Sequence, residues 1–210
     1  MSDVLDAPEQ RLSPADFPRV LGDVGAELGG PTLVCVGGLH GNEPSGVHGL
    51  MRVVRALEQD RSGLQGRVLA LSGNRKGLAV DERDLAHDLN RAWTPARLAR
   101  VHAEEGPVGA EDAELLELET LIGQAIDDAP GYAAVFDHHT TSGGGAPFVT
   151  MDDTLANRRL AFQFPAPHVL GLEEELAGTM LGYWIERGVP AVGFESGQHQ
   201  DPGSVDRAAA

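Results

Sequence analysis

The amino-acid sequence predicts an α/β fold, with a largely parallel sheet and helices on both of its faces. Apolar runs of strand length alternate along the chain with segments whose apolar residues recur at helical spacing, which is the pattern of β-α-β crossovers. The 210 residues suit one domain with a sizeable core. Hydrophobic residues make up 41% of the chain and aromatic residues only 5%, so this core is expected to be mainly aliphatic.

The expected elements follow from these patterns in chain order. Residues 32–36 form an apolar run that indicates a buried strand, and residues 44–59 place Val47, Leu50 and Val54 at helical spacing. Further strands are expected at 66–72, 132–136, 147–150, 168–170 and 189–194, and further helices at 113–126, 154–162 and 176–187. Less regular structure is expected at 1–30 (with one short strand), at 73–77 (a turn) and at 78–109 (a charged segment).

The charge of the chain argues against one class of partner. The formal net charge is −16, whereas a nucleic-acid-binding protein needs a basic surface. No stretch is long enough to span a membrane, and residues 1–4 lack the basic and apolar pattern of a signal peptide. We therefore expect a cytoplasmic protein with neither nucleic acid nor membrane as a partner. Its single cysteine, Cys35, cannot form an internal disulfide.

A glycine-rich stretch at 37–46 carries the first candidate site. It follows the strand expected at 32–36 and leads into the helix expected at 44–59, so His40 and Glu43 lie on a strand-to-helix turn. Ligand sites form at this edge of a parallel sheet. Zinc accepts nitrogen and oxygen ligands, and a His-Glu-His set leaves one position for water. A His-x-x-Glu pair also occurs by chance on many solvated surfaces. Whether His40 and Glu43 bind a metal therefore depends on further ligands elsewhere in the chain.

Two further strands are expected to end at polar, glycine-containing turns. Asp137, His138 and His139 follow the strand expected at 132–136, and Glu195 follows the strand expected at 189–194. A parallel sheet would bring all three turns to one edge, which favours a metallohydrolase.

The chain resembles a known family in four motifs that occur in the family's order. They are Gly-Gly-Leu-His-Gly-Asn-Glu at 37–43, Asp-Leu-Asn-Arg at 88–91, Asp-His-His-Thr-Thr-Ser at 137–142 and Gly-Phe-Glu-Ser-Gly at 193–197. This pattern is similar to that of aspartoacylase and succinylglutamate desuccinylase, in the zinc-carboxypeptidase-like superfamily, and it covers residues 32–207. The resemblance implies an α/β/α sandwich around a mixed sheet, one zinc ion per chain, and hydrolysis of the amide bond of an N-acyl amino acid.

The resemblance also implies the zinc ligands, which would be His40, Glu43 and His139. The family usually has an apolar residue where this chain has His138. If the strand continues, His138 points to the opposite side from His139, and we expect it to be a packed or surface residue, although an exchange of roles between the two is an alternative. Asp137 could orient a ligand histidine or merely cap the strand.

Four further residues match functional positions of the family. Glu195 matches its general base, and Asn90 and Arg91 match the pair that holds a substrate carboxylate, for which an arginine fork is suited. Arg83 matches an arginine that polarises the scissile carbonyl. From the residues alone, Glu195 could instead be a helix-capping acid, Arg91 a surface arginine, and Arg83 part of a solvated loop.

The chain departs from the family near its end. The family carries a further C-terminal β-rich domain, which is expected to be absent here, so that 1–210 is a single catalytic domain. Either this is a fragment, as suggested by a helix that opens at 204–210 and then stops abruptly, or it is a minimal form. The predicted substrate is a small anionic N-acyl amino acid. Alternatives are a metallocarboxypeptidase acting on peptide C-termini, or a non-catalytic module that binds a metal or small molecule. A homo-oligomer is compatible with the sequence, which does not define the oligomeric state.

Overall fold

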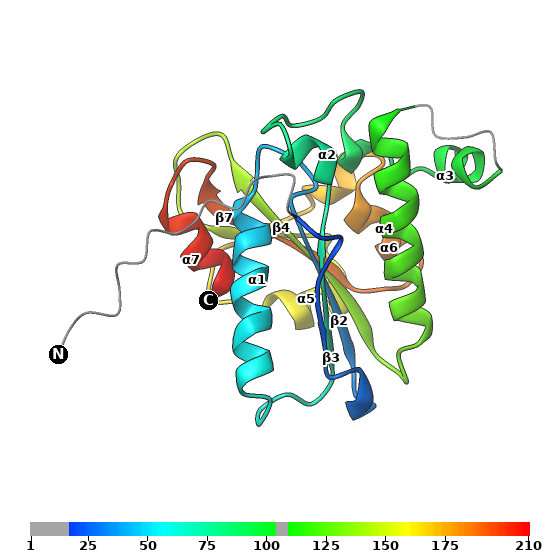
Figure 1. Ribbon diagram of the computed structural model, residues 1–210. Helices are drawn as coiled ribbons and strands as arrows, with labels where there is room; N and C mark the ends of the chain where they lie inside the picture. The colour runs from blue at the N-terminus through cyan, green and yellow to red at the C-terminus, as the bar shows by residue number, and fades with distance from the viewer. Residues whose placement is uncertain (1–16, 104–108) are drawn as a thin grey trace.

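Seven strands form one mixed sheet in the order β1-β3-β2-β4-β7-β5-β6 (Figure 1). The computed structural model describes residues 17–103 and 109–210. The strands are β1 Val20–Val24, β2 Thr32–Gly37, β3 Arg67–Ser72, β4 Ala133–Thr141, β5 Phe148–Met151, β6 His168–Leu170 and β7 Ala191–Gln198. Strands β3, β2, β4 and β7 run parallel to one another, and β1 and β5 pair antiparallel to their neighbours β3 and β7. The expected largely parallel sheet is thus confirmed.

Helices cover both faces of this sheet. The α-helices are α1 Ser45–Gln59, α2 Arg75–Leu78, α3 Pro95–His102, α4 Ala110–Asp127, α5 Leu155–Ala161, α6 Met180–Ile185 and α7 Gly203–Ala209, and short 3-10 turns lie at Ala26–Leu28, Leu89–Arg91 and Glu173–Glu175. In Figure 1, α1 and α7 lie on one side of the sheet and α4 and α6 on the other. Among the described residues, the helices lack the combination of length and hydropathy that a membrane-spanning helix needs.

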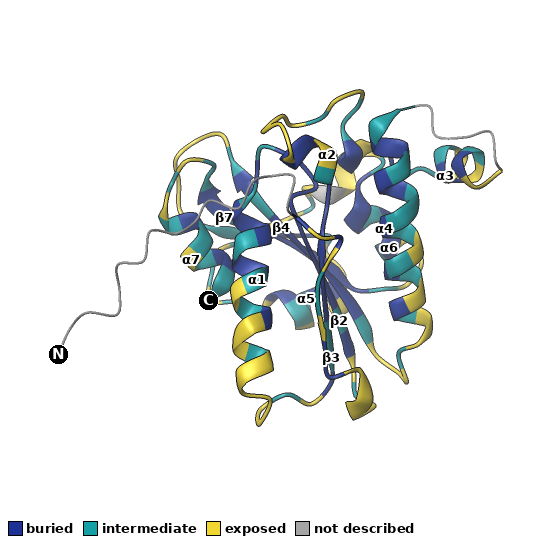
Figure 2. Ribbon diagram, viewed as in Figure 1, coloured by how far each residue is buried: buried dark blue, intermediate teal, exposed yellow. Residues whose placement is uncertain are grey.

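The strands contribute side chains to two apolar cores, one on each face of the sheet. Val34 and Val135 face the core beneath α4 and α6, whereas their neighbours Cys35 and Phe136 face the core beneath α1 and α5. This alternation is the consequence of successive strand side chains pointing to opposite faces. Figure 2 shows the result as a buried sheet with buried inner helix faces and exposed outer ones. The same alternation assigns each polar residue at the strand ends to one face.

The elements agree with the expected ones except at several boundaries. Strands β4 and β7 do not end at residues 136 and 194, because their parallel pairing continues through the partners His139 and Glu195. Helix α3 lies in the segment expected to be irregular, where the Thr94 side chain accepts a hydrogen bond from the Arg97 amide, 3.3 Å away. The segment 73–77, expected to be a turn, contains the start of α2. The helix expected at 176–187 begins only at Met180.

Close packing surrounds the turn between β2 and α1. A Cβ atom on Gly41 would lie 2.1 Å from the Gly77 carbonyl carbon and 2.3 Å from the Glu82 carbonyl oxygen. The Gly41 amide also donates a hydrogen bond to the Arg83 carbonyl, at 3.1 Å. Because the atoms that a side chain would meet belong to the backbone of α2 and of the loop after it, only glycine fits at this position of the turn.

We therefore expect Gly41→Ala to destabilise the fold by about 1–3 kcal/mol, the usual cost of overpacking a well-packed site. Urea unfolding monitored by circular dichroism measures this effect. Gly63→Ala is the matched control, because no atom lies within 4 Å of a Cβ at Gly63, and its unfolding midpoint is expected to stay near that of the wild type. Equal midpoints for the two variants would contradict the packing described for Gly41.

Candidate metal centre

Three side chains that can bind a metal converge at the carboxyl edge of the sheet. His40 and Glu43 lie on the turn between β2 and α1, and His139 lies in β4. One ligand atom from each lies within 4.8 Å of the other two, and no other such group occurs among the described residues. His40 and Glu43 are buried, and His139 is partly buried. The structure thus brings together the three residues that the family motif implies as zinc ligands.

The two imidazole rings are held in the same manner. His40 Nδ1 lies 2.8 Å from Glu43 Oε1, and His139 Nδ1 lies 3.2 Å from Glu43 Oε2. The opposite ring nitrogens contact carboxylates, with His40 Nε2 lying 3.1 Å from Asp88 Oδ1 and His139 Nε2 lying 2.7 Å from Asp137 Oδ2. Metal-binding histidines commonly make this second contact, which fixes the ring. Both Nδ1 atoms are thereby directed to one place.

Electrostatics favour a cation at this place. Burial opposes ionisation of Glu43, but hydrogen bonds from His139 and His40 outweigh it and hold the pKa of Glu43 well below its usual range. Burial likewise acts on Asp88, yet contacts with His40 and Arg83 hold its pKa low. Glu43 and Asp88 are therefore ionised at neutral pH. Their negative charge suits a divalent cation.

Glu195 lies beside this group on the neighbouring strand. It is the β-sheet partner of His139 in the β4–β7 register, and the alternation of strand side chains places both on the face covered by α4 and α6. The Oε2 atom of Glu195 is buried and has no hydrogen-bond partner, and burial raises the pKa of this carboxyl. The expected position on a turn after the strand is wrong, because β7 extends to Gln198. Its placement next to His139 nevertheless suits a group that exchanges protons at the site.

His138 lies on the other face of the sheet, away from His139. Its ring packs against Phe136 and Phe194, with centroid distances of 4.6 and 6.3 Å. A Cβ on Gly46 of α1 would lie 2.6 Å from the His138 Cβ. Burial, followed by the charge of His139, lowers the pKa of His138 to about 3. His138 was expected to be either packed or at the surface, and the structure shows it packed.

Arg83 reaches the centre from the loop after α2. Its Nη1 lies 3.7 Å from Glu43 Oε1, and its Nη2 donates a hydrogen bond to Asp88 Oδ2 at 2.8 Å. The side chain is 44% exposed. The sequence allows Arg83 to be either part of a solvated loop or a residue of the site. The two are compatible, because Arg83 belongs to a solvated loop and still faces the metal-binding group.

Asn90 and Arg91 follow Asp88 in a 3-10 turn. The Asn90 Oδ1 accepts a hydrogen bond from the Met180 amide at 2.9 Å, a contact with the start of α6 that the sequence did not suggest. Arg91 is exposed and donates to the Asn90 carbonyl at 2.7 Å. In the part of the chain that the structure describes, it forms no ion pair with a carboxylate. A contact of either residue with substrate stays a prediction.

Three contacts at the centre could not be predicted from the sequence. Asp88 meets His40, although the sequence separates them by 48 residues. The Thr140 amide donates to Glu43 Oε2 at 2.7 Å, while the Thr140 hydroxyl lies 2.7 Å from His199 Nδ1. Asp88 opens a motif shared with the family, which was the one available signal. No pattern along the chain indicates the contact with His199.

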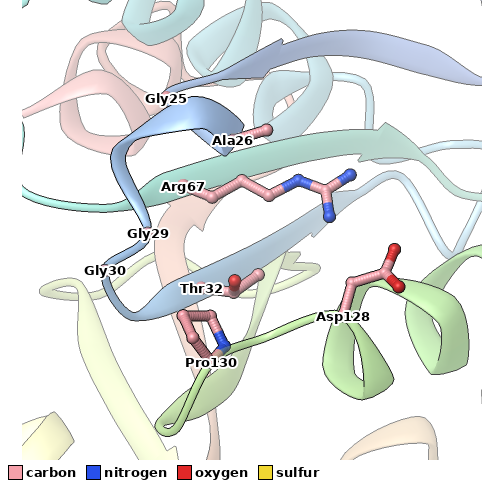
Figure 3. A pocket seen from close by; sticks show the side chains of 8 residues that line it. All are labelled: Gly25, Ala26, Gly29, Gly30, Thr32, Arg67, Asp128 and Pro130. Carbon is pink, nitrogen blue, oxygen red and sulfur yellow. The ribbon is translucent and has the colours of Figure 1, made fainter.

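A cavity of about 260 Å³ lies at the opposite edge of the sheet (Figure 3). It is lined by Thr32 and Arg67, the first residues of β2 and β3, and by Asp128 beyond α4. The Arg67 guanidinium forms two hydrogen bonds of 2.8 Å with the Asp23 carboxylate. Because the metal-binding group follows the other end of β2, this cavity is separate from it.

Sequence comparisons connect the chain to one family. The model of the succinylglutamate desuccinylase/aspartoacylase catalytic domain matches residues 29–208. Among curated proteins, the succinylglutamate desuccinylase of Photorhabdus laumondii is 30% identical over 98 residues, covering 47% of this chain and 28% of that protein. The enzyme of the same name from Pseudomonas paraeruginosa is 31% identical over 121 residues, covering 58% and 34%. These alignments span about a third of each relative's length or less.

Solved structures share the fold. The succinylglutamate desuccinylase from Chromobacterium violaceum matches with a TM-score of 0.71 at 20% identity, over 89% of this chain and 60% of that chain. A succinylglutamate desuccinylase/aspartoacylase from Rhodobacter sphaeroides gives 0.65 at 23% identity, over 86% and 53%. A proposed metallopeptidase from Shewanella denitrificans gives 0.55 at 18% identity, over 86% and 71%. The α/β architecture expected from the sequence is confirmed.

Proposed function

The chain belongs to the succinylglutamate desuccinylase/aspartoacylase family, and we propose that it is a zinc-dependent hydrolase that cleaves the amide bond of an N-acyl amino acid. The observation that supports this most is the convergence of His40, Glu43 and His139 within 4.8 Å, next to the unpartnered carboxylate oxygen of Glu195. A metal-binding group beside a buried base is the arrangement that hydrolysis by an activated water requires.

The donor set fits zinc. Two imidazoles and one carboxylate are among its usual protein ligands, and three protein ligands leave a fourth position open in catalytic sites. Asp88 and Asp137 hold the outer nitrogens of the two rings. When bound, zinc supplies a Lewis acid that lowers the pKa of water towards about 7 and polarises a carbonyl oxygen.

Glu195 is proposed as the general base. Its Oε2 is buried and has no other hydrogen-bond partner, so this oxygen is free to accept a proton from the attacking water. Burial raises the pKa of Glu195, which brings it closer to the operating pH. The carboxylate is then a stronger base towards water, and more of the group stays protonated for transfer of the proton to the leaving amine. One carboxyl group thus takes the proton in the first step and returns it in the second.

Arginines are proposed to orient the substrate. Arg83 faces Glu43 at 3.7 Å, where its positive charge would stabilise the oxyanion that forms from the scissile carbonyl. Arg91, exposed and without an ion pair among the described residues, is available to bind a substrate carboxylate through two parallel hydrogen bonds, with Asn90 beside it. In a chain of net charge −16, such local cations are needed to attract an anionic substrate.

A substrate panel tests this function. The zinc-loaded protein is incubated with N-succinylglutamate, with N-acetylaspartate and with peptides of matched C-termini, and the released amino groups are measured. We expect hydrolysis of an N-acyl amino acid. Cleavage of the peptides alone would favour a metallocarboxypeptidase, and zinc binding without hydrolysis of any substrate would favour a non-catalytic binding module.

A further inference from the structure

The loop at 79–88 supplies two side chains to the metal centre. Asp88 contacts His40 Nε2 at 3.1 Å, and Arg83 lies 3.7 Å from Glu43. The loop has no helix or strand of its own. On the side of the metal centre, the Arg83 carbonyl accepts a hydrogen bond from the Gly41 amide, at 3.1 Å. On the other side of the loop, the His87 ring contacts Arg97 of α3, with 3.0 Å between Nδ1 and Nη2. The backbone in the middle of the loop needs a partner of its own if Arg83 and Asp88 are to keep their places.

Glu111, in the first turn of α4, occupies that position. Its carboxylate accepts hydrogen bonds from the backbone amides of Leu85 at 2.6 Å and Ala86 at 3.1 Å. These amides lie between Arg83 and Asp88 in the chain. A third bond, of 3.3 Å, comes from the Asn74 side-chain amide. The carboxylate therefore holds the middle of the loop by two charge-assisted bonds, which are stronger than neutral ones.

The burial of Glu111 makes this arrangement unusual. Its side chain is 0% exposed, and within residues 17–103 and 109–210 the basic group beside it is His87 Nδ1, at 3.7 Å. A buried carboxylate is costly unless its oxygens are satisfied, and here backbone amides of the loop satisfy both of them. The contacts of Glu111 therefore tie the buried start of α4 to the loop.

We propose that Glu111 is a positioning residue, which holds the loop at 79–88 so that Asp88 orients His40 and Arg83 faces the centre. The link to catalysis rests on the proposed function. The structural link, from Glu111 through the loop amides to Asp88 and His40, does not depend on it.

The test uses Glu111→Gln, Asp88→Asn and the double variant. A glutamine at 111 keeps the size of the side chain but turns an NH₂ group towards a backbone N–H, so one loop contact is lost. Glu119→Gln is the matched control. It lies on the same helix and contacts the Tyr183 hydroxyl at 3.0 Å and His102 at 3.1 Å, outside the loop.

Two quantities are measured. The first is the pair of imidazole ¹⁵N chemical shifts of His40 in the metal-free protein, which report its hydrogen bond to Asp88. The second is the Kd for zinc, obtained by competition with a chromophoric chelator. We expect Glu111→Gln to shift the His40 signals in the same direction as Asp88→Asn and to weaken zinc binding about tenfold, the lower end of the effect of removing a residue that orients a ligand. Glu119→Gln is expected to change neither.

The double variant shows whether Glu111 acts through Asp88. If it does, the double variant binds zinc no more weakly than Asp88→Asn alone, because the effects of two coupled substitutions on the binding free energy are not additive. Additive losses, or unchanged His40 signals with a lowered unfolding midpoint, would overturn the proposal and leave Glu111 with a role in stability only. If the wild type binds no zinc, the proposed function fails, and the His40 signals still decide the role of Glu111.

Discussion

Replacing His139 with alanine is expected to remove zinc from the protein. The His139 Nδ1 and the His40 Nδ1 both face Glu43, at 3.2 and 2.8 Å, so the variant would leave one imidazole and one carboxylate at the centre. Losing a ligand should cost more than losing a residue that only orients one, which is worth about 10–100-fold in metal affinity. We therefore expect the Kd for zinc to rise more than about 100-fold, with loss of hydrolysis.

The neighbouring histidine provides the control. His138→Ala removes the same kind of side chain one position away, from the opposite face of the sheet, where it packs against Phe136. This variant is expected to unfold more easily and to keep its zinc. Zinc content measured by elemental analysis distinguishes the two. If His138→Ala lost its zinc and His139→Ala kept it, His138 would be the metal ligand and His139 the packed residue.

Glu195→Gln is expected to lower kcat about 10²–10⁴-fold, the usual contribution of a general base, while zinc stays bound. Glutamine has nearly the same shape as glutamate but cannot take a proton from water at neutral pH. The side chain has no hydrogen bond at Oε2 in the structure, so the change breaks no contact there. Steady-state kinetics and zinc content are measured on the same preparation.

Stability gives a second readout for this variant. Burial raises the pKa of Glu195, so the folded protein holds the proton more strongly than the unfolded chain, and its stability falls as the pH rises through that pKa. At neutral pH, a neutral glutamine removes this cost. We expect Glu195→Gln to unfold at an equal or higher urea concentration than the wild type. Loss of zinc would instead make Glu195 a ligand, and unchanged kcat would require another base.

The sequence predicts the turn at 37–46 well, because its signals are local. An apolar run precedes it and a helical pattern follows it, and both flanking elements appear as β2 and α1. The polar ends of β4 and β7, which the sequence predicts as turns, continue the strands for a physical reason. Apolarity marks a strand only while both of its faces are buried in the core, and these strands continue into the metal centre, where Asp137, His139 and Glu195 replace apolar residues.

Contacts between distant segments could not be predicted in the same way. Asp88 pairs with His40, and Glu111 pairs with the Leu85 and Ala86 amides. Both pairings depend on how the loop at 79–88 folds back between α4 and the turn that joins β2 to α1. No periodic pattern specifies this path. The hydrogen bond from the Met180 amide to Asn90 is similar, because a side chain that accepts one distant backbone amide leaves no trace in composition or spacing.

The measurement that tests the central claim most directly is hydrolysis as a function of zinc occupancy. Metal is removed from the protein with a chelator, the chelator is removed by dialysis, and zinc is added back in steps while bound zinc and the release of amino acid from an N-acyl amino acid are followed together. We predict that activity is lost with the metal, returns in proportion to bound zinc, and reaches its maximum at about one zinc per chain. Activity that does not depend on zinc, or full zinc occupancy without hydrolysis, would contradict the account.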